Sequence, residues 1–307
     1  MTVLAFLGPE GTFAHAALRL VPAAAGATLL PMTTVTLAID AVRNGDADGA
    51  VVPLENSVEG AVPATLDELA NGAPLVIADE AYLPVAFDLM ARPGVGLNDI
   101  RTVATHPHAE AQVRRWLIAT LPNASVALVD STAGAAQAVA TGEYDAAIGA
   151  AVAGELYGLN SLVNDIADTV GAVTRFVLLT RPAPPPRPTG NDRTTLVAYL
   201  ADDHSGALLE ILTEFATRAV NLTRIESRPI KGRIGQYCFS IDCEGHIADE
   251  RVGDAIAALH RVCADVRYLG SYIRRDGTQG VITRGRADSN FVEARSWLAT
   301  VRETGTS

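Results

Sequence analysis

Lysine is almost absent from this sequence of 307 residues, because Lys231 is the only one among 24 basic side chains. A catalytic lysine that forms a Schiff base with a carbonyl substrate would therefore have to be this residue. The other basic side chains are arginines, whose planar guanidinium groups bind carboxylates through two hydrogen bonds. The composition thus argues against Schiff-base chemistry and is compatible with a carboxylate ligand.

Cysteine is also scarce, and Cys238, Cys243 and Cys263 show no CxxC spacing. They lie in apolar patterns, so we expect buried thiols rather than a disulfide framework or a metal site. The six histidines show no HExxH arrangement, which again argues against a metal. The sequence therefore implies no cofactor.

Long apolar runs are missing as well, and no stretch reaches the length of a transmembrane helix. Residues 1–3 lead directly into a strand pattern, without the basic start and cleavage site of a signal peptide. The formal net charge of −11 argues against nucleic acid as a partner. We therefore expect a reduced, soluble, cytoplasmic protein that binds neither membranes nor nucleic acids.

Apolar residues, which make up 49% of the chain, follow alternating strand and helix patterns in its first part. Strands are expected at residues 3–7, 28–32 and 50–53, with helices between them. Strands that alternate with helices form a parallel sheet, and ligands bind at the carboxyl ends of such strands. The polar loops 8–12 and 54–60 fall at that edge, so we expect a binding site there.

A second set of strand patterns follows, after which the chain returns to the first sheet. These strands are expected at residues 102–105, 126–129, 146–148 and 162–166, and the returning strand at 174–180. The pattern predicts a two-lobed α/β domain of the periplasmic-binding-protein-like kind. Its first lobe would comprise residues 1–76 and 174–181, and its second lobe residues 77–173. Closure of such a cleft on a small anion excludes water and strengthens the hydrogen bonds inside it.

Prolines mark the next boundary, since five of them fall within residues 182–188. We expect a stiff linker over residues 182–193. From 194 to 275 the patterns run strand, helix, strand, strand, helix, strand, which predicts a ferredoxin-like βαββαβ module. Residues 276–307 form a polar tail with one helical pattern at 291–301.

Short motifs in a fixed order carry a resemblance to a known family. In the first part of the chain they are Gly8-Pro9-Glu10-Gly11-Thr12-Phe13, Pro53-Leu54-Glu55-Asn56-Ser57, His106-Pro107, Ser131-Thr132-Ala133 and Thr174-Arg175-Phe176. In the later module they are Gly206-Ala207-Leu208-Leu209 and Glu226-Ser227-Arg228-Pro229. Over residues 1–275 the chain resembles bacterial monofunctional prephenate dehydratases that carry a C-terminal ACT regulatory domain.

The resemblance implies a reaction in the biosynthesis of L-phenylalanine. Prephenate would lose carbon dioxide and its ring hydroxyl, and aromatisation of the ring to give phenylpyruvate would drive the step. The family assigns catalysis to Thr174, Arg175 and Phe176, with Thr174 protonating the departing hydroxyl. Because a threonine hydroxyl does not titrate near neutral pH, we expect it to donate a strong hydrogen bond or to relay a proton. Arg175 is expected either to contact the substrate or to pair with a carboxylate of the fold.

The resemblance also implies substrate-binding residues from both lobes. They are Gly11, Thr12, Glu55, Asn56, Ser57, His106, Gln112, Ser131 and Thr132. Glu55 is expected to anchor a loop by accepting N–H hydrogen bonds, because a bare carboxylate would repel a dianion. The family often has an asparagine shortly before the Thr-Arg-Phe motif, whereas residues 169–173 here read Thr-Val-Gly-Ala-Val. One hydrogen bond that supports Thr174 is therefore unaccounted for.

In the ACT domain the resemblance implies a site at which L-phenylalanine lowers the activity. Its residues would be Gly206, Ala207, Leu208, Leu209, Asn221, Leu222, Glu226, Ser227, Arg228 and Pro229. Gly206 lets a ligand approach the start of a helix, where free N–H groups suit a carboxylate. ACT domains pair edge to edge, so a homodimer or a tetramer is expected.

Two alternatives stay open at this point. The same chemistry on arogenate would give phenylalanine directly. A two-lobed sensor that binds a small anion without catalysis would keep the cleft, although a complete Thr-Arg-Phe motif argues for chemistry.

Overall fold

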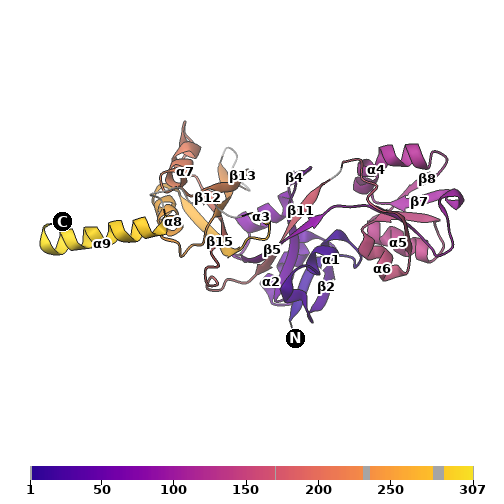
Figure 1. Cartoon of the computed structure of the whole chain (residues 1–307), viewed down its shortest axis with the longest axis horizontal. Coiled ribbons are helices and arrows are strands. Elements are labelled where there is room, and N and C mark those ends of the chain that lie inside the picture. Colours follow the sequence, from indigo (N-terminus) through magenta and orange to yellow (C-terminus); the bar gives the residue numbers. More distant parts are fainter. Residues whose placement is uncertain (1, 170, 231–235, 279–286, 307) are drawn as a thin grey trace. The chain divides into compact units, whose positions relative to one another are not determined.

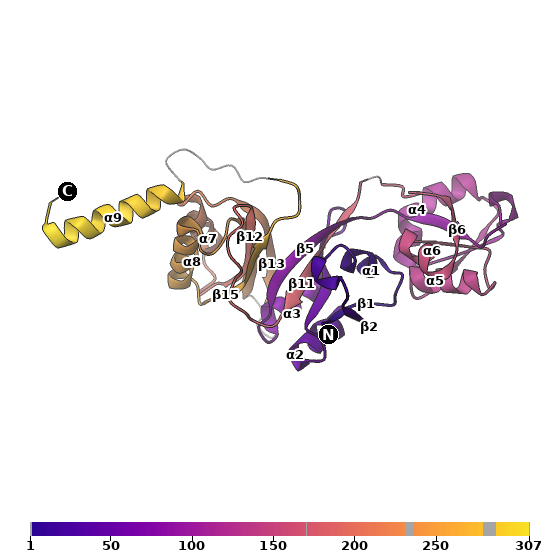
Figure 2. The same cartoon turned by 60° about the horizontal axis from the view of Figure 1, so that its bottom comes forward.

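The computed structural model describes residues 2–169, 171–230, 236–278 and 287–306, so Val170 and Lys231 lie outside the described residues. The chain folds into two compact units. Met1–Thr65 and Ala81–Leu179 form the first unit, and Leu66–Glu80 and Thr180–Ser307 form the second. Figures 1 and 2 show the elements of each unit.

The first lobe of the first unit is built on a six-stranded sheet with the order β2-β1-β3-β11-β5, and β4 pairs with β3. The strands are β1 (Val3–Leu7), β2 (Thr28–Met32), β3 (Gly49–Asn56), β4 (Gly60–Ala61), β5 (Val76–Pro84) and β11 (Val173–Thr180). Its helices are α1 (Phe13–Leu18) and α2 (Val35–Asn44), while α3 (Pro63–Asn71) begins in this unit and continues into the second. Leu4 and Phe6 pack with Leu18 of α1, because alternate residues of a strand share one face. The returning strand β11 therefore completes the sheet that β1 begins.

The second lobe contains a five-stranded sheet with the order β10-β6-β9-β7-β8. Its strands are β6 (Asp88–Ala91), β7 (Thr102–Thr105), β8 (Ser125–Leu128), β9 (Ala146–Gly149) and β10 (Asn160–Val163). Its helices are α4 (Pro107–Thr120), α5 (Thr132–Ala140) and α6 (Ala151–Tyr157). Strand residues of one parity pack with α4 and those of the other parity pack with α5 and α6, so helices cover both faces (Figures 1 and 2). The predicted two-lobed α/β class is confirmed.

Side chains cap the starts of three helices near the strand ends. Thr12 caps α1 by accepting the N–H of His15, and Ser131 caps α5 by accepting the N–H of Gly134. The imidazole of His106 caps α4, and Pro107 occupies its first turn. Such caps satisfy N–H groups that have no partner within the helix.

The second unit contains the predicted βαββαβ order in one antiparallel sheet, β13-β14-β12-β15. Its elements are β12 (Asp192–Tyr199), α7 (Ala207–Ala216), β13 (Leu222–Pro229), β14 (Tyr237–Glu244), α8 (Glu250–Val262) and β15 (Asp265–Ile273). Ile211, Phe215 and Leu259 of the two helices pack on Leu196 and Ile241 of the sheet. The ferredoxin-like prediction is therefore confirmed.

The cysteines of this module differ in burial. Cys238 and Cys243 are buried as expected, but Cys263 is only partly buried because it ends α8. Removal from water raises the pKa of Cys243 to about 12 and that of Cys263 to about 11. Both thiols therefore stay protonated and unreactive near neutral pH.

Beyond the module, α9 (Asp288–Thr304) is longer than the helix expected at residues 291–301. None of its residues is buried. It meets α8 through ion pairs of Arg295 with Glu250 and of Asp288 with Arg251. Across the described parts of the chain, no helix is both long enough and apolar enough to cross a membrane.

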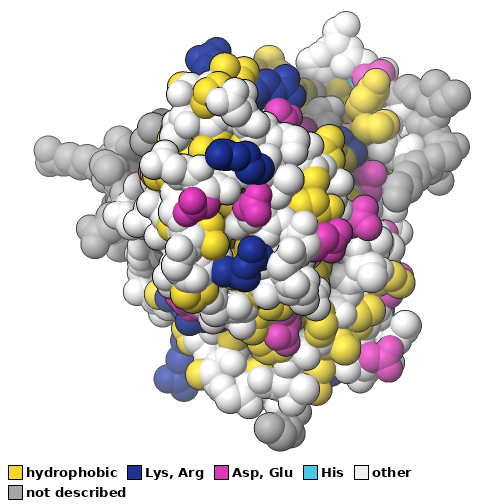
Figure 3. Space-filling model, turned by 90° about the vertical axis from the view of Figure 1, so that its right-hand side faces the viewer, with side chains coloured by type: hydrophobic (Ala, Val, Ile, Leu, Met, Phe, Trp, Pro, Cys, Tyr) yellow, Lys and Arg dark blue, Asp and Glu magenta, His cyan; other side chains and the backbone are white. Residues whose placement is uncertain are grey.

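The outer face of the second lobe mixes charges of both signs. In Figure 3 the described acidic and basic side chains on this face stand among apolar ones and do not gather by sign. The view therefore shows no continuous basic surface of the kind that nucleic acid requires.

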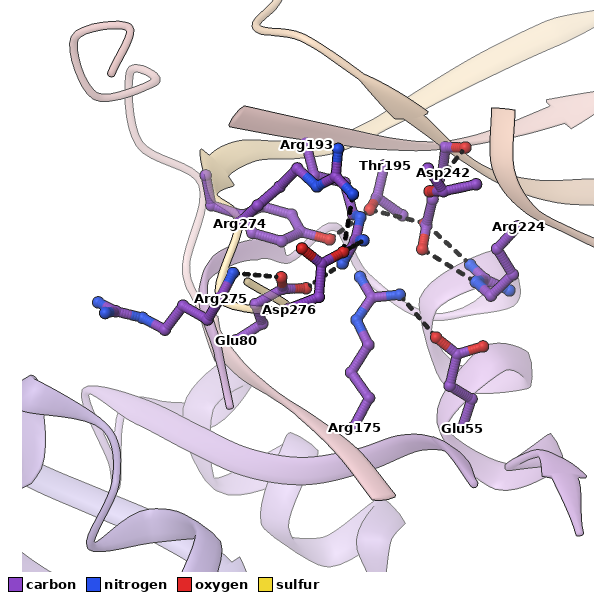
Figure 4. Close-up of polar contacts among 12 residues, drawn as sticks. Glu55, Glu80, Arg175, Arg193, Thr195, Arg224, Asp242, Arg274, Arg275 and Asp276 are labelled. Atoms are coloured by element: carbon purple, nitrogen blue, oxygen red, sulfur yellow. Dashed lines mark hydrogen bonds and ion pairs between the residues drawn. The ribbon is translucent and has the colours of Figure 1, made fainter. Parts of the chain in front are cut away.

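Residues 66–80 join the C-terminal module, although the sequence analysis divided them between the two lobes. Glu80 in β5 is fully buried, and its Oε2 lies 2.5 Å from Nη1 of Arg193 in β12. Arg193 also lies 2.7 Å from Asp276, which Arg274 contacts at 2.8 Å (Figure 4). Contacts between residues so distant in sequence leave no periodic signal, which is why patterns did not place this segment.

We expect Glu80→Ala to lower the free energy of unfolding by about 3 kcal/mol, because it leaves the buried Arg193 with fewer counter-charges. Urea unfolding followed by circular dichroism measures this. The matched control is Glu155→Ala, which breaks the exposed Arg19–Glu155 pair and should cost about 0–1 kcal/mol. Equal losses in the two variants would contradict a structural role for the buried pair.

Candidate active site

A cavity of about 450 Å³ lies between the two lobes of the first unit. It brings together eight of the residues predicted from the sequence. These are Thr12, Asn56, His106, Gln112, Ser131, Thr132, Thr174 and Phe176. Four other predicted residues, namely Gly11, Glu55, Ser57 and Arg175, are not part of its lining.

Thr174 is the second residue of β11 and is oriented by Asn56 at the end of the neighbouring β3. The Asn56 Nδ2 donates to the Thr174 Oγ1 at 2.8 Å. The Asn56 Oδ1 accepts the N–H groups of Val58 and Glu59 at 2.8 and 3.0 Å, which fixes the orientation of the amide. Within the described residues, no acceptor is recorded for the Thr174 hydroxyl hydrogen. That hydrogen is thus available to a ligand in the cavity.

Ser57 supplies hydrogen bonds that support the residues before Thr174, where the sequence lacks the asparagine that is common in the family. Its Oγ accepts the N–H of Val173 at 2.9 Å, and its own N–H donates to the Val173 carbonyl at 2.9 Å. These two hydrogen bonds hold the backbone immediately before Thr174. The apolar approach to the motif is therefore supported from β3 rather than by a nearby asparagine.

Arg175 points away from the cavity. Its side chain is 2% exposed, and its Nη1 lies 2.9 Å from the Glu55 Oε1, as Figure 4 shows. The period of two along a strand puts Thr174 and Phe176 on one face and Arg175 on the other. Arg175 thus has the carboxylate partner of one of its two expected roles. Glu55 accepts from this guanidinium, which differs from the loop N–H groups expected to be its donors.

The N–H of Gly11, which was expected to face a substrate carboxylate, instead donates to the Nδ1 of His15 at 3.0 Å. Burial lowers the pKa of His15, which favours the neutral ring that can accept this hydrogen. Gly11 has a φ of +88°, and a Cβ there would lie 3.3 Å from that of Ala133 in α5. Glycine is therefore required for conformation and close packing at this position.

Helix starts contribute positive partial charges at the cavity. None of its described lining residues is an arginine or lysine, whereas Glu59 and Asp130 carry carboxylates. His106 and Ser131, the caps of α4 and α5, both line it. The N-terminus of a helix carries a partial positive charge and favours anions.

Three further residues that the motifs did not indicate also line the cavity, namely Glu59, His108 and Asp130. Glu59 belongs to the polar loop 54–60 that was expected at the strand end, and its Oε1 accepts from the Gln112 Nε2 at 3.1 Å. Because Gln112 belongs to α4, this hydrogen bond joins the two lobes. The His108 ring stacks on that of His106 with 5.4 Å between centroids. The only feature of the sequence that indicated Glu59 as a site residue was its position in the loop 54–60.

A smaller cavity of about 270 Å³ lies at the start of α7. Gly206, Ala207, Leu208 and Ser227 line it, while the other predicted effector residues do not. Gly206 has a φ of +97° and no side chain caps this helix. Arg228 lies outside the lining and pairs with Asp67 at 2.8 Å.

Two α/β lobes around a cavity lined by both polar and apolar side chains, followed by a ferredoxin-like module, define the class of two-lobed cleft proteins with an attached small domain. The family model for prephenate dehydratase matches residues 4–184, and the ACT domain model matches residues 194–261. The chain therefore belongs to the prephenate dehydratase family, a family of carbon–oxygen lyases. The family predicted from the motifs is confirmed.

Proteins similar in sequence or structure match this chain over most of its length. A prephenate dehydratase from Amycolatopsis methanolica is 52% identical over 98% of both chains. The solved prephenate dehydratase from Arthrobacter aurescens, in complex with L-Phe, is 49% identical, covers 98% of this chain and 100% of its own, and has a TM-score of 0.90. GqqA, described as a novel type of quorum quenching acylase, is 34% identical over 89% of this chain and 98% of its own, with a TM-score of 0.79. The relatives with the higher identities are prephenate dehydratases, so arogenate and a sensor are not favoured.

Proposed function

We propose that the cavity binds prephenate and that Thr174 assists the loss of its ring hydroxyl. The carboxylate leaves as carbon dioxide, its bonding electrons enter the ring, and the C–O bond to the hydroxyl breaks. The departing oxygen takes a proton and becomes water, and the ring becomes aromatic. The Thr174 hydroxyl hydrogen, which has no acceptor within the described residues, is directed to that oxygen.

The observation that supports this role most strongly is the hydrogen bond from Asn56 to Thr174. An amide that donates to the hydroxyl oxygen polarises the O–H group and makes it a stronger donor. The same amide cannot accept from the hydroxyl, because its oxygen already binds two backbone N–H groups. Asn56 thus sets the direction in which Thr174 donates.

Substrate binding follows from the rest of the lining. The starts of α4 and α5 at His106, Ser131 and Thr132 would receive the two carboxylates. The rings of Phe13 and Phe87, one from each lobe, meet edge to face with 5.2 Å between centroids and offer an apolar wall for the substrate ring. We propose a structural role for Arg175 and Glu55, which hold β11 against β3.

Purified protein mixed with prephenate tests this function directly. Phenylpyruvate, read by its absorbance in alkali, is expected to form much faster than in a sample without protein. Arogenate run in parallel should be turned over more slowly. Absence of phenylpyruvate above the spontaneous rate would overturn the proposal.

We further propose that L-phenylalanine binds at the start of α7 and lowers the activity. The start of α7 behind Gly206 carries the partial positive charge that suits its carboxylate, and the cavity there is lined by Leu208, Tyr237 and Phe239. A relative of 49% identity was solved in complex with L-Phe. Both observations support an effector site in this module.

Gly206→Leu is expected to abolish inhibition by L-phenylalanine while activity without effector is kept. A Cβ at Gly206 meets no atom within 4 Å, so a leucine side chain would extend into open space at the helix start. The control is Gly206→Ala, which has the same strain at positive φ with little added bulk. Inhibition curves measure the effect, and a leucine variant that remains fully inhibitable would exclude this site.

We also propose that two copies pair along β13. This strand is an edge of its sheet, and Ile225 on it is 40% exposed. An unpaired edge strand is a ready template for another strand. Sedimentation at several concentrations distinguishes the expected dimer from a tetramer or a monomer.

The cytoplasmic location expected from the sequence stays a prediction.

A further inference from the structure

Residues 66–80 are held by the C-terminal module along their whole length. At one end Asp67 of α3 accepts from the Arg228 Nη2 and Nε at 2.8 and 3.1 Å. In the middle, the Arg267 guanidinium donates to the carbonyls of Leu69 and Gly72 at 2.9 and 2.8 Å. The module thus contacts both the helix and the turn that follows it.

At the other end the contacts are ionic, and the pair that Glu80 forms is buried. Glu80 receives the Arg193 guanidinium and also the N–H of Arg275 at 2.9 Å (Figure 4). Arg275 in turn binds both oxygens of Asp79 at 2.6 and 2.8 Å. A buried charge is tolerated only with such partners. These contacts therefore fix Asp79 and Glu80, which lie in the part of β5 that belongs to the second unit, to the module.

Asp276 extends this network within the module. Burial alone would raise the pKa of Asp276, but hydrogen bonds from Arg274 and Thr278 outweigh it and hold the pKa well below its usual value. The carboxylate is therefore ionised and bridges Arg193 and Arg274. The attachment of β5 is charged and specific rather than a simple apolar contact.

The same segment continues at each end into residues that hold the catalytic hydroxyl. Thr65, just before it, donates to the Pro53 carbonyl at 2.6 Å, three residues from Asn56. After it, β5 runs beside β11 in the sheet of the first lobe. Where β5 ends, the N–H of Val85 donates to the Ala172 carbonyl at 2.7 Å, two residues before Thr174. A shift of the segment would reach both members of the Asn56–Thr174 hydrogen bond.

We propose that residues 66–80 carry the effector signal, with the Arg228–Asp67 and Arg193–Glu80 ion pairs as their two attachments to the module. The inference rests on the proposed L-phenylalanine site. Arg228 belongs to the strand that carries Ser227 of that site, so a ligand that moves this strand pulls on Asp67. Asp67 and Glu80 are then positioning residues, which act on Thr174 through the backbone and never touch the substrate.

Asp67→Asn tests the inference, because it removes one charge at a partly exposed position and keeps the shape of the side chain. In the unmodified chain, saturating L-phenylalanine should change kcat/KM by about 5- to 150-fold, the usual size of an allosteric coupling. In the variant this ratio is expected to fall to below about 2-fold, and activity without effector should stay within about 2-fold. The dissociation constant for L-phenylalanine, measured by calorimetry on the full chain, should change by less than about 3-fold, within the range of surface substitutions.

The matched control is Asp254→Asn, which breaks the 2.6 Å pair with Arg218 in the same module without touching residues 66–80. It should keep full inhibition. Glu80→Gln is expected to uncouple binding from inhibition in the same way as Asp67→Asn. Full inhibition in either folded variant, or loss of L-phenylalanine binding by Asp67→Asn, would overturn the inference. If the unmodified chain itself fails to bind L-phenylalanine, the proposed effector site fails and takes this inference with it.

Discussion

Replacement of Thr174 by alanine is expected to lower kcat by about 10²–10⁴ and to leave KM within a few-fold, because the lost interaction forms only as the C–O bond breaks. This corresponds to roughly 3–5 kcal/mol of transition-state stabilisation. Thr174 lines the cavity and its oxygen accepts from Asn56, so we expect its hydrogen to be donated into the cavity. The residual rate reports the tendency of the bound ring to aromatise without that donor. Initial rates of phenylpyruvate formation at neutral pH provide the measurement.

Two further variants separate the effect of the Thr174 hydroxyl from the effect of the side chain's shape. Thr174→Ser keeps the hydroxyl and should retain substantial activity. Thr174→Val keeps the branched shape and removes only the hydroxyl, so it should lose about as much kcat as the alanine variant. Thermal unfolding should show all three folded, since β11 stays paired on both sides. Near-normal turnover by the valine variant would show that no hydrogen from this residue reaches the leaving group.

Local patterns were sufficient for most of the fold because most helices and strands have their own signal. Strand and helix patterns predicted the βαββαβ order of residues 194–275, and the prolines of the linker separated two kinds of topology. The loops at 8–12 and 54–60 were expected at one edge of a parallel sheet, and Thr12 and Asn56 from them do meet in one cavity. Rules about strands, helices and caps act over a few residues, so the sequence exposes them directly.

Contacts between distant residues were not predictable in this way. The side of β11 on which Arg175 lies follows from the strand period, but its pairing with Glu55 depends on which strand lies beside β11. The neighbour is β3, more than a hundred positions earlier in the chain. The contact of Ser57 with Val173 and the attachment of residues 66–80 to the module have the same origin. Periodicity in one segment says nothing about its partner in another.

Asn56→Asp is expected to reduce kcat by about 10²–10³, close to the loss in Thr174→Ala, although it exchanges one NH2 group for an oxygen. The aspartate can still accept the N–H groups of Val58 and Glu59, so the loop should keep its conformation. Its second oxygen can only accept, and the Thr174 hydroxyl must then donate to it. The hydrogen that the substrate needs is turned away from the cavity.

The double variant isolates this effect from the added negative charge. If Asn56 acts through the hydroxyl, Asn56→Asp should cost little further kcat once Thr174 is alanine, which is the non-additivity expected of two members of one hydrogen-bonded pair. Repulsion of the dianion should appear in KM in both backgrounds. A protonated aspartic acid can donate again, so the kcat loss should shrink as the pH falls toward about 4. Full additivity of the two substitutions in kcat would mean that Asn56 acts on the substrate independently of Thr174.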